Sequence, residues 1–416
     1  MTDEYSYSAA DRTILRDLAK RVAEVAALPV MEERRRLWKK FNALKPERPM
    51  ILVFPEGSWR EIKADWKFQC QGPAGNIEDA LRTTLWTHEH MDTDVPVEAD
   101  FCVGKAITDT GWGLQPQWIY SREETGARKF DQVLHSAADL KKLHFSVVSH
   151  DAEASAKNLE FFTELFSDIL TVKQAGIKFV GFHLIQQYTF LRGLEQAMVD
   201  MYECPELIHE AMRFFQEGNR RLVQQYLDQG LLDLNNDGTY NNSGGLSYSD
   251  ELPQKDFAGK VRFKDLWACA ETQEFALVSP QMHEEFALQY EKPLLEPFGL
   301  TGYGCCEDLT NKLDYVFKIP HIRRISMSPW ADVDRCAARL KGDYIFSWKA
   351  HPAHMVGQFK SDMIRQYIRH TLEVCCDNGC VLEMILKDTH SCAGHPERFT
   401  QWTKIARELV NEFAGK

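Results

Sequence analysis

The first part of the chain shows a helical pattern of apolar positions followed by one short apolar run. Over 11–44, apolar residues recur at spacings of three and four, and the pattern is interrupted at Pro29. This spacing predicts a pair of helices, each with one apolar face. Residues 50–54 are continuously apolar and are followed by Pro55 and Gly57, which end strands. We therefore expect an N-terminal helix pair that leads into a buried strand.

From about residue 136 onward, helical patterns alternate with short apolar runs. A helical pattern over 151–175 leads into the apolar run 177–185, and a longer pattern over 194–230 is broken at Pro205. The alternation continues to the C-terminus, which is typical of parallel strands connected by helices. Strands are predicted near residues 50, 179, 232, 267, 302, 325, 345 and 383. This strand count predicts an α/β fold of the (β/α)8 TIM-barrel type.

The domain division follows from the same pattern. Residues 1–45 are expected to form an N-terminal helical extension, and residues 46–416 are expected to form the barrel. Residues 58–130 are rich in Trp, Gly and Pro and show no clear periodicity, so they are expected to form strands and loops without a definite assignment. No Gly-rich linker separates the predicted elements, which favours one barrel over two domains.

Composition and charge narrow the class of protein. The 416 residues carry a formal net charge of −12, and 44% of them are hydrophobic. A nucleic-acid or anionic-membrane binder needs a basic surface, so neither partner is expected. No segment approaches the ~20 apolar residues of a membrane span, and the N-terminus has no apolar signal region. Eleven cysteines, an odd number, favour reduced thiols and a cytoplasmic location.

Polar and thiol side chains follow the predicted strands. Because barrel chemistry occurs at the carboxyl ends of strands, these residues are the candidates for a site. They are Glu56, His183, Gln186, Gln187, Asn235, Asn236, Asp237, Cys269, Glu271, Cys305, Cys306, Glu307, Ser326, Ser328, Lys349, His351, Lys387, Asp388, His390 and Cys392. The chain has no Gly-x-Ser-x-Gly motif, no GxGxxG after a strand and no P-loop, which disfavours serine hydrolases, dinucleotide binding and nucleoside triphosphate binding.

Thiols at two strand ends suggest a metal. The segments GYGCCED and KDTHSC place Cys305 and Cys392 where they could converge, and thiolates select zinc. Packing of Cys305 and Cys306 in the barrel wall is the alternative. A carboxylate at Glu271 would point into the barrel opening. His183 is either a base or a hydrogen-bonded core histidine, and Asp237 is either a functional acid or part of a turn.

The sequence from about residue 150 to the C-terminus resembles the uroporphyrinogen decarboxylase superfamily, which includes zinc-dependent, corrinoid-linked methyltransferases. The resemblance rests on FHLIQQYTFLRGLEQAMVDMYECPELIHEAM, SPQMHEEFALQYEKPLLEPFG and GYGCCEDLTNKLDYVFKIPHIRRISMS. It implies a (β/α)8 barrel. The Arg-rich segment of the haem-pathway decarboxylases is replaced by VFPEGSWREIK, so that activity is not implied.

The metal set implied by the resemblance is altered in this chain. The methyltransferases of this superfamily bind zinc through a His-x-Cys pair and a distant Cys near the last strand. Here Tyr303 stands at the His position and Cys305 matches the first Cys, while Cys392 or Cys380 corresponds to the distant one. The set would be completed by Glu271, His390 or Cys306.

Three functions compete. The first is a methyltransferase or demethylase component that passes a methyl group from a small O- or N-methylated substrate to a corrinoid on a partner protein, with zinc held by Cys305, Cys392 and Glu271 or His390. Asp237 or His183 would then orient the substrate or act as acid and base. The second is a metal-independent decarboxylase of a small aromatic or pyrrolic acid, in which Asp237 or His183 would stabilise the protonated ring. The third is a non-catalytic ligand-binding barrel.

Overall fold

The centre of the molecule is one sheet of seven parallel strands. The computed structural model describes residues 7–122, 129–241 and 244–414. The sheet order is β1-β13-β12-β11-β10-β9-β8, and every pair is parallel. The strands are β1 (Met50–Val53), β8 (Gly181–Phe182), β9 (Trp267–Ala270), β10 (Leu300–Tyr303), β11 (Ile322–Met327), β12 (Ile345–Ala350) and β13 (Val381–Leu386). The predicted parallel α/β sheet is therefore present.

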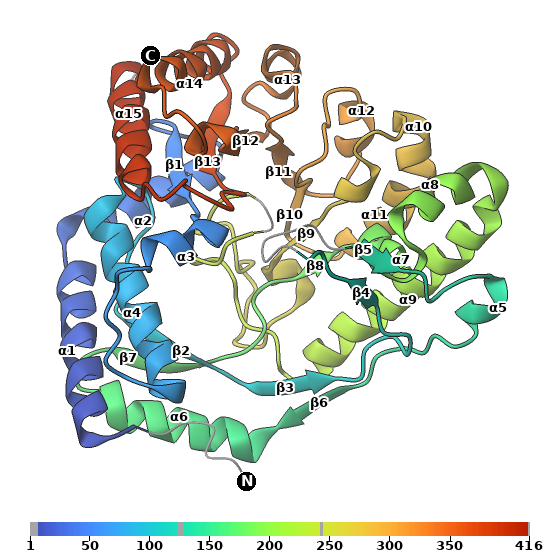
Figure 1. The fold of residues 1–416 in the computed structure, drawn as a ribbon. Coiled ribbons are helices and arrows are strands. Elements are labelled where there is room, and N and C mark those ends of the chain that lie inside the picture. Colours follow the sequence, from blue (N-terminus) through green and yellow to red (C-terminus); the bar gives the residue numbers. More distant parts are fainter. Residues whose placement is uncertain (1–6, 123–128, 242–243, 415–416) are drawn as a thin grey trace.

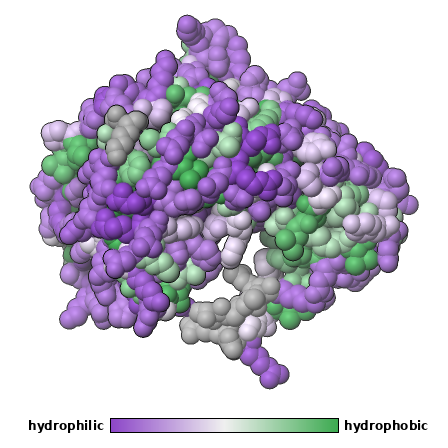
Figure 2. All heavy atoms as spheres, turned by 90° about the horizontal axis from the view of Figure 1, so that it is seen from above, coloured by the Kyte–Doolittle hydropathy of each residue, from purple (hydrophilic) through white to green (hydrophobic). Residues whose placement is uncertain are grey.

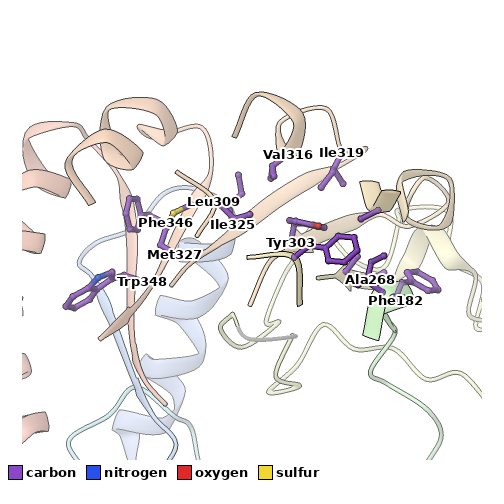
Figure 3. Close-up of a cluster of buried hydrophobic side chains, with 14 of the residues drawn as sticks. Phe182, Ala268, Tyr303, Leu309, Val316, Ile319, Ile325, Met327, Phe346 and Trp348 are labelled. Carbon is purple, nitrogen blue, oxygen red and sulfur yellow. The ribbon is translucent and has the colours of Figure 1, made fainter. Parts of the chain in front are cut away.

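Helices cover the outer side of the curved sheet (Figure 1). The helices of this part are α7 (Leu184–Arg192), α8 (Leu194–Glu203), α9 (Pro205–Asp228), α10 (Pro280–His283), α11 (Gln289–Leu295), α12 (Leu313–Val316), α13 (Val333–Leu340), α14 (Ser361–Asp377) and α15 (Glu397–Phe413). Side chains of alternate strand positions, among them Ile325, Phe346 and Trp348, form the core between sheet and helices (Figure 3). The opposite, inner face of the strands carries polar residues, among them Ser326, Ser347 and Lys349.

Of the eight predicted strands, the one near residue 232 does not join the sheet. Near residue 232 the described backbone makes only an isolated parallel bridge between Ile177 and Leu232. The side chain of Asn235 lies between the neighbouring segments instead. Its Nδ2 donates to the carbonyl oxygens of Lys178 and Trp267, and its Oδ1 accepts from the Trp267 N–H. A side-chain amide thus replaces a backbone ladder at this position, and closure of the sheet into a barrel is not confirmed.

The N-terminal part of the chain, up to residue 175, lies partly across from the sheet as an N-terminal layer, partly beside β1 (29–42 and 59–62) and partly beside α7 (129–140) (Figure 1). It contains α1 (Ala9–Ala26), α2 (Pro29–Asn42), α3 (Trp59–Ile62), α4 (Gly72–His90), α5 (Ala137–Leu140) and α6 (Ala152–Phe166). Three small strand pairs connect them: β2 (Asp100–Gly104) with β7 (Thr171–Ala175), β3 (Ala106–Asp109) with β6 (Val148–Asp151), and β4 (Gln117–Ile119) with β5 (Lys129–Asp131). The predicted helix pair before residue 45 is present as α1 and α2.

The expected helix over 151–175 is too long. Helix α6 ends at Phe166, and Thr171–Ala175 instead forms β7, which pairs in parallel with β2. The partner strand lies about seventy residues earlier in the chain, so the local apolar spacing carried no sign of this pairing.

The surface is mostly hydrophilic, with separate hydrophobic patches, in the view from above Figure 1 (Figure 2). Among the described residues, no helix combines the length and apolar character that a membrane crossing would require.

Candidate active site

The carboxyl ends of the sheet strands bring together the side chains that we call the mouth, defined as His183, the turn 271–274, the turn 305–307, and the pair Lys387 and Asp388. Each of these residues follows a strand of the sheet directly. Parallel strands place their carboxyl ends at one edge, so residues distant in sequence become neighbours there. The polar composition of this edge makes it the candidate active site.

A histidine–carboxylate pair joins β8 and β9. His183, the residue before α7, lies 2.6 Å through Nδ1 from Oε1 of Glu271. The Glu271 side chain is 3% exposed and that of His183 is 25% exposed, so the carboxylate is enclosed and the imidazole reaches solvent. Burial lowers the pKa of His183, but the hydrogen bond and the charge of Glu271 raise it more, and the pKa lies above its ordinary value. The pair can therefore hold a transferable proton at neutral pH.

A second proton-holding group stands beside this pair. Burial and the charge of Glu271 raise the pKa of Glu274 to about 7. The Oε2 atom of Glu274 is enclosed and has no hydrogen-bond partner among the described residues. A carboxyl group with this pKa can exchange protons near neutral pH. The sequence analysis did not select Glu274, although it lies three residues after Glu271 in the same turn.

The turn after β10 carries the most acidic thiol of the mouth. The Cys305 Sγ lies 3.5 Å from the Cys306 Sγ and 4.0 Å from the Lys387 Nζ. The hydrogen bond with Cys306 lowers the pKa of Cys305 and burial raises it, while the charge of Lys387 lowers it further, so the net shift is downward. The pKa of Cys306 is raised, first by its hydrogen bond with Cys305 and then by burial. Cys305 is therefore the more acidic thiol of this pair.

A buried carboxylate fixes the two turns to each other. Glu307 is fully buried, and its Oε2 accepts from the Cys305 N–H at 2.7 Å while its Oε1 accepts from the Thr272 N–H at 3.1 Å. The backbone after β9 and after β10 is thus held by one side chain. Glu307 is a residue whose role the sequence did not assign.

Basic groups lie on the inner side of β12 and β13. Lys349 is 2% exposed, and its Nζ donates to the carbonyl oxygen and the hydroxyl of Ser347. Burial lowers the pKa of Lys349 to about 7. Burial also lowers the pKa of Lys387, but the charges of Cys305 and Asp388 raise it more. The Lys349 amine, which is partly neutral near pH 7, and the Lys387 ammonium group thus face the same region.

The four predicted metal ligands do not form one centre. Cys392 donates through Sγ to Glu61 Oε2 at 3.2 Å, and the Cys392 N–H donates to the same oxygen. Burial and Glu61 raise the pKa of Cys392 to about 11, so this sulfur is a thiol. Within the described part of the chain, no three His, Cys, Asp or Glu side chains are arranged to hold a metal ion. The predicted set of Cys305, Cys392, Glu271 and His390 does not fit zinc in this arrangement, and we derive no step through it.

The two predicted catalytic residues lie at different places. Asp237 pairs with Lys178, whose Nζ lies 2.5 Å from Oδ2, and it accepts from the N–H and hydroxyl of Thr239. Lys178 precedes β8, whereas His183 follows it. Burial raises the pKa of Asp237, but Lys178 and Thr239 lower it more. Asp237 is therefore an ionised carboxylate in a turn, as its alternative interpretation held, and of the six predicted residues only His183 and Glu271 are in direct contact.

Comparisons with known proteins identify no family. No protein-family model matches the chain, and no curated protein matches it. Among solved structures, the chain is similar to a methyltransferase from Methanosarcina mazei at 10% sequence identity. The match covers 91% of this chain and 98% of that chain, with a TM-score of 0.48.

Proposed function

We propose that the chain is an enzyme that transfers a methyl group from a small O- or N-methylated substrate to a corrinoid carried by a separate protein. The observation that supports this proposal is the proton-holding pair of His183 and Glu271 at the open end of the sheet, with Glu274 beside it. A group that delivers a proton to a leaving oxygen or nitrogen is what demethylation requires.

The proton of His183 binds to the electron pair that the broken bond leaves on the heteroatom. When the bond between the methyl carbon and the heteroatom breaks, both electrons stay on the heteroatom, which takes the Nε2 proton of His183. Glu271 holds the ring through Nδ1 and stabilises its charge before transfer. Glu274, with a pKa of about 7, can return a proton from solvent to His183 after each turnover. A reduced corrinoid supplies the electron pair that receives the methyl carbon.

A second candidate function is supported by a specific observation. The buried Lys349 donates through Nζ to the carbonyl oxygen and the hydroxyl of Ser347, and Lys387 directly follows the next strand of the sheet. Two basic groups of this kind could hold the carboxylate of a substrate that loses carbon dioxide, and His183 would then protonate the carbon left behind. This is the metal-independent decarboxylase that the sequence also allowed.

Methyl transfer is tested with free reduced cobalamin as the acceptor under anaerobic conditions. A panel of O-methyl and N-methyl compounds is incubated with the protein, and demethylated product is quantified by mass spectrometry. We expect product with wild type and a loss of at least about 100-fold in rate for H183Q, because general acid catalysis contributes 10²–10⁴-fold.

A matched control separates the site from a general effect of removing histidine. His370 also pairs with a carboxylate, Asp334 at 2.9 Å, but both lie on the outer helices and are exposed. H370Q is expected to retain the wild-type rate. The absence of demethylated product from the whole panel, or an unchanged rate in H183Q, would contradict the proposal. Release of carbon dioxide from an aromatic acid without any acceptor would favour the decarboxylase.

A further inference from the structure

A cavity of about 580 Å³ lies beside the edge strand β1, between the sheet and the N-terminal layer. Its wall contains residues of β1, α3, α4 and β2, together with Val22 of α1 and Arg34 of α2. Cavities of this size accommodate small-molecule ligands. Neither the sequence motifs nor the mouth chemistry accounts for it.

Most of the cavity wall is apolar. It includes Val53, Phe54, Trp59, Leu81, Phe101 and Leu170. The Trp59 ring is held by Trp86, with a centroid distance of 5.5 Å, and by Trp66 at 6.4 Å. An aromatic wall that is fixed by its neighbours is suited to the apolar body of a ligand.

One unpaired cation stands in this wall. The Arg34 Nη1 donates to the Val95 carbonyl oxygen at 2.9 Å, but Arg34 forms no ion pair within residues 7–122, 129–241 and 244–414. Of the three acids in the wall, Glu98 pairs with Arg35 at 2.8 Å and Asp100 pairs with Lys173 at 2.7 Å, while Glu56 has a raised pKa and lies close to Asp388. The charge left to attract an anion in the rest of the wall is therefore that of Arg34.

The charges around Arg34 are of both signs. Burial is the main cause that lowers the pKa of Arg34, the charges of Asp94 and Asp92 raise it, and those of Arg407 and Arg48 lower it. Asp94 accepts hydrogen bonds from both of those arginines. His88, another wall residue, has a pKa lowered by burial and by Arg34, so it is a neutral neighbour. Because burial is the main cause of the lowered pKa of Arg34, an anion bound to its guanidinium group would stabilise that buried charge.

The other end of the cavity approaches the mouth. Glu56 lines the cavity, and burial and the charge of Asp388 raise its pKa, which shows that the two carboxylates are close. Phe54 also lines the cavity and packs against Tyr240 with a centroid distance of 4.5 Å. A ligand anchored at Arg34 would thus extend along β1 toward the strand ends.

We propose that this cavity binds a small carboxylate with an apolar, preferably aromatic, body, whose carboxylate is held by Arg34 and whose body packs against Trp59 and Phe54. The binding itself follows from the cavity and its charge. The further step, that this ligand is the substrate and directs its reacting end past Glu56 toward the mouth, rests on the proposed function.

The test uses 4-ethylbenzoate and its neutral analogue 4-ethylbenzamide as probes, with binding measured by isothermal titration calorimetry. We expect wild type to bind the benzoate at least about tenfold more tightly than the benzamide, since only the carboxylate can form a charge-assisted hydrogen bond with Arg34. R34M should remove this preference and leave the affinity for the benzamide unchanged. R36Q is the matched control, because Arg36 lies on the same helix but pairs at the surface with Glu33 and Glu47.

A second variant covers the case in which R34M does not fold. L81F narrows the cavity without altering its charge and should weaken both probes together. Failure of both probes to bind wild type, or a benzoate preference that persists in R34M, would overturn the proposal. If the probes bind as expected but no compound is demethylated, the proposed function fails and the binding site remains. If a compound is demethylated but neither probe binds, the proposed binding site fails and the proposed function remains.

Discussion

At the residue scale, two cysteines that the sequence treats alike have opposite chemistry. Cys305 has a lowered pKa because of its hydrogen bond with Cys306 and because of the charge of Lys387, whose Nζ lies 4.0 Å from its Sγ. Cys392 has a pKa of about 11 because it is buried and faces the carboxylate of Glu61. Glu61 is 331 residues away in sequence, so no spacing near Cys392 could reveal it. The sequence identified the thiols, but their ionisation depends on partners that only the fold supplies.

This difference predicts selective alkylation. At pH 7, iodoacetamide should modify Cys305 well before Cys392, because the thiolate is the reacting form. K387M should raise the pKa of Cys305 and slow its alkylation about threefold to tenfold at this pH, since a nearby cation favours the thiolate. The rate at each cysteine is measured from pH 5 to 9 by peptide mass spectrometry. K404M, on the exposed face of α15, is the control, and an unchanged Cys305 profile in K387M would refute the role of Lys387.

Glu274 predicts a pH-dependent stability. Its folded pKa is raised from 4.5 to about 7, first by burial and then by the charge of Glu271. The stabilisation from its protonated form is therefore fully present below about pH 4.5 and is lost as the pH rises through about 7. E274Q stays neutral throughout, so at pH 8 it should be more stable than wild type by up to about 3 kcal/mol, at 1.36 kcal/mol per pKa unit.

The measurement is urea unfolding of both proteins at pH 5 and pH 8. The gain of E274Q should shrink toward the lower pH, because wild-type Glu274 is protonated there as well. If E274Q is more stable than wild type by the same amount at pH 5 and pH 8, the difference in stability comes from packing and not from the charge of Glu274.

At the element scale, the two turns that carry Glu271 and Cys305 depend on Glu307. Truncation in E307A would leave the N–H groups of Thr272 and Cys305 without their acceptor in a fully buried place. We expect a loss of about 2–4 kcal/mol in the free energy of unfolding, because each unsatisfied buried group costs about 1–3 kcal/mol. E307Q keeps one acceptor oxygen and should lose about half as much. Equal stability of E307A and wild type in urea unfolding would exclude this role.

The elements that could be predicted from the sequence are those with strong local patterns. The helix pair before residue 45, the break at Pro205 and the strands of the sheet near 325, 345 and 383 follow from apolar spacing alone. Residues 58–130 could not be assigned because their strands are short, partly exposed and paired with 129–175. Of the site, His183, Glu271 and Glu307 were selected by strand-end position, but the role of Glu307 depends on its contact with the turn after β9. Glu274 lacked any distinguishing local signal.

At the scale of the whole molecule, the inner side of the sheet is occupied by the segment that follows residue 232, where the predicted strand is missing (Figure 1). Asn42 of α2 donates to the carbonyl oxygens of Leu246 and Tyr248. Arg324 of β11 pairs with Glu383 of β13 at 3.0 Å directly beneath this segment. The segment therefore packs against the inner face where a closed barrel would have its own side chains, and its backbone must approach the sheet closely.

That close approach predicts a strict requirement for glycine. A Cβ added at Gly245 would lie 2.1 Å from the Glu383 Oε2 and 2.9 Å from the Trp38 ring, and both of these side chains are fully buried. G245A should therefore lower the free energy of unfolding by about 1–3 kcal/mol or more, as overpacking of a core does. Gly104 is the control, since a Cβ there meets nothing within 4 Å, and G104A should change stability by less than about 0.5 kcal/mol. Urea unfolding compares the two, and a stable G245A would mean that the segment can move away from the sheet. In that case the inner face near Lys349 would be open to ligands, and the region available for chemistry would extend below the mouth.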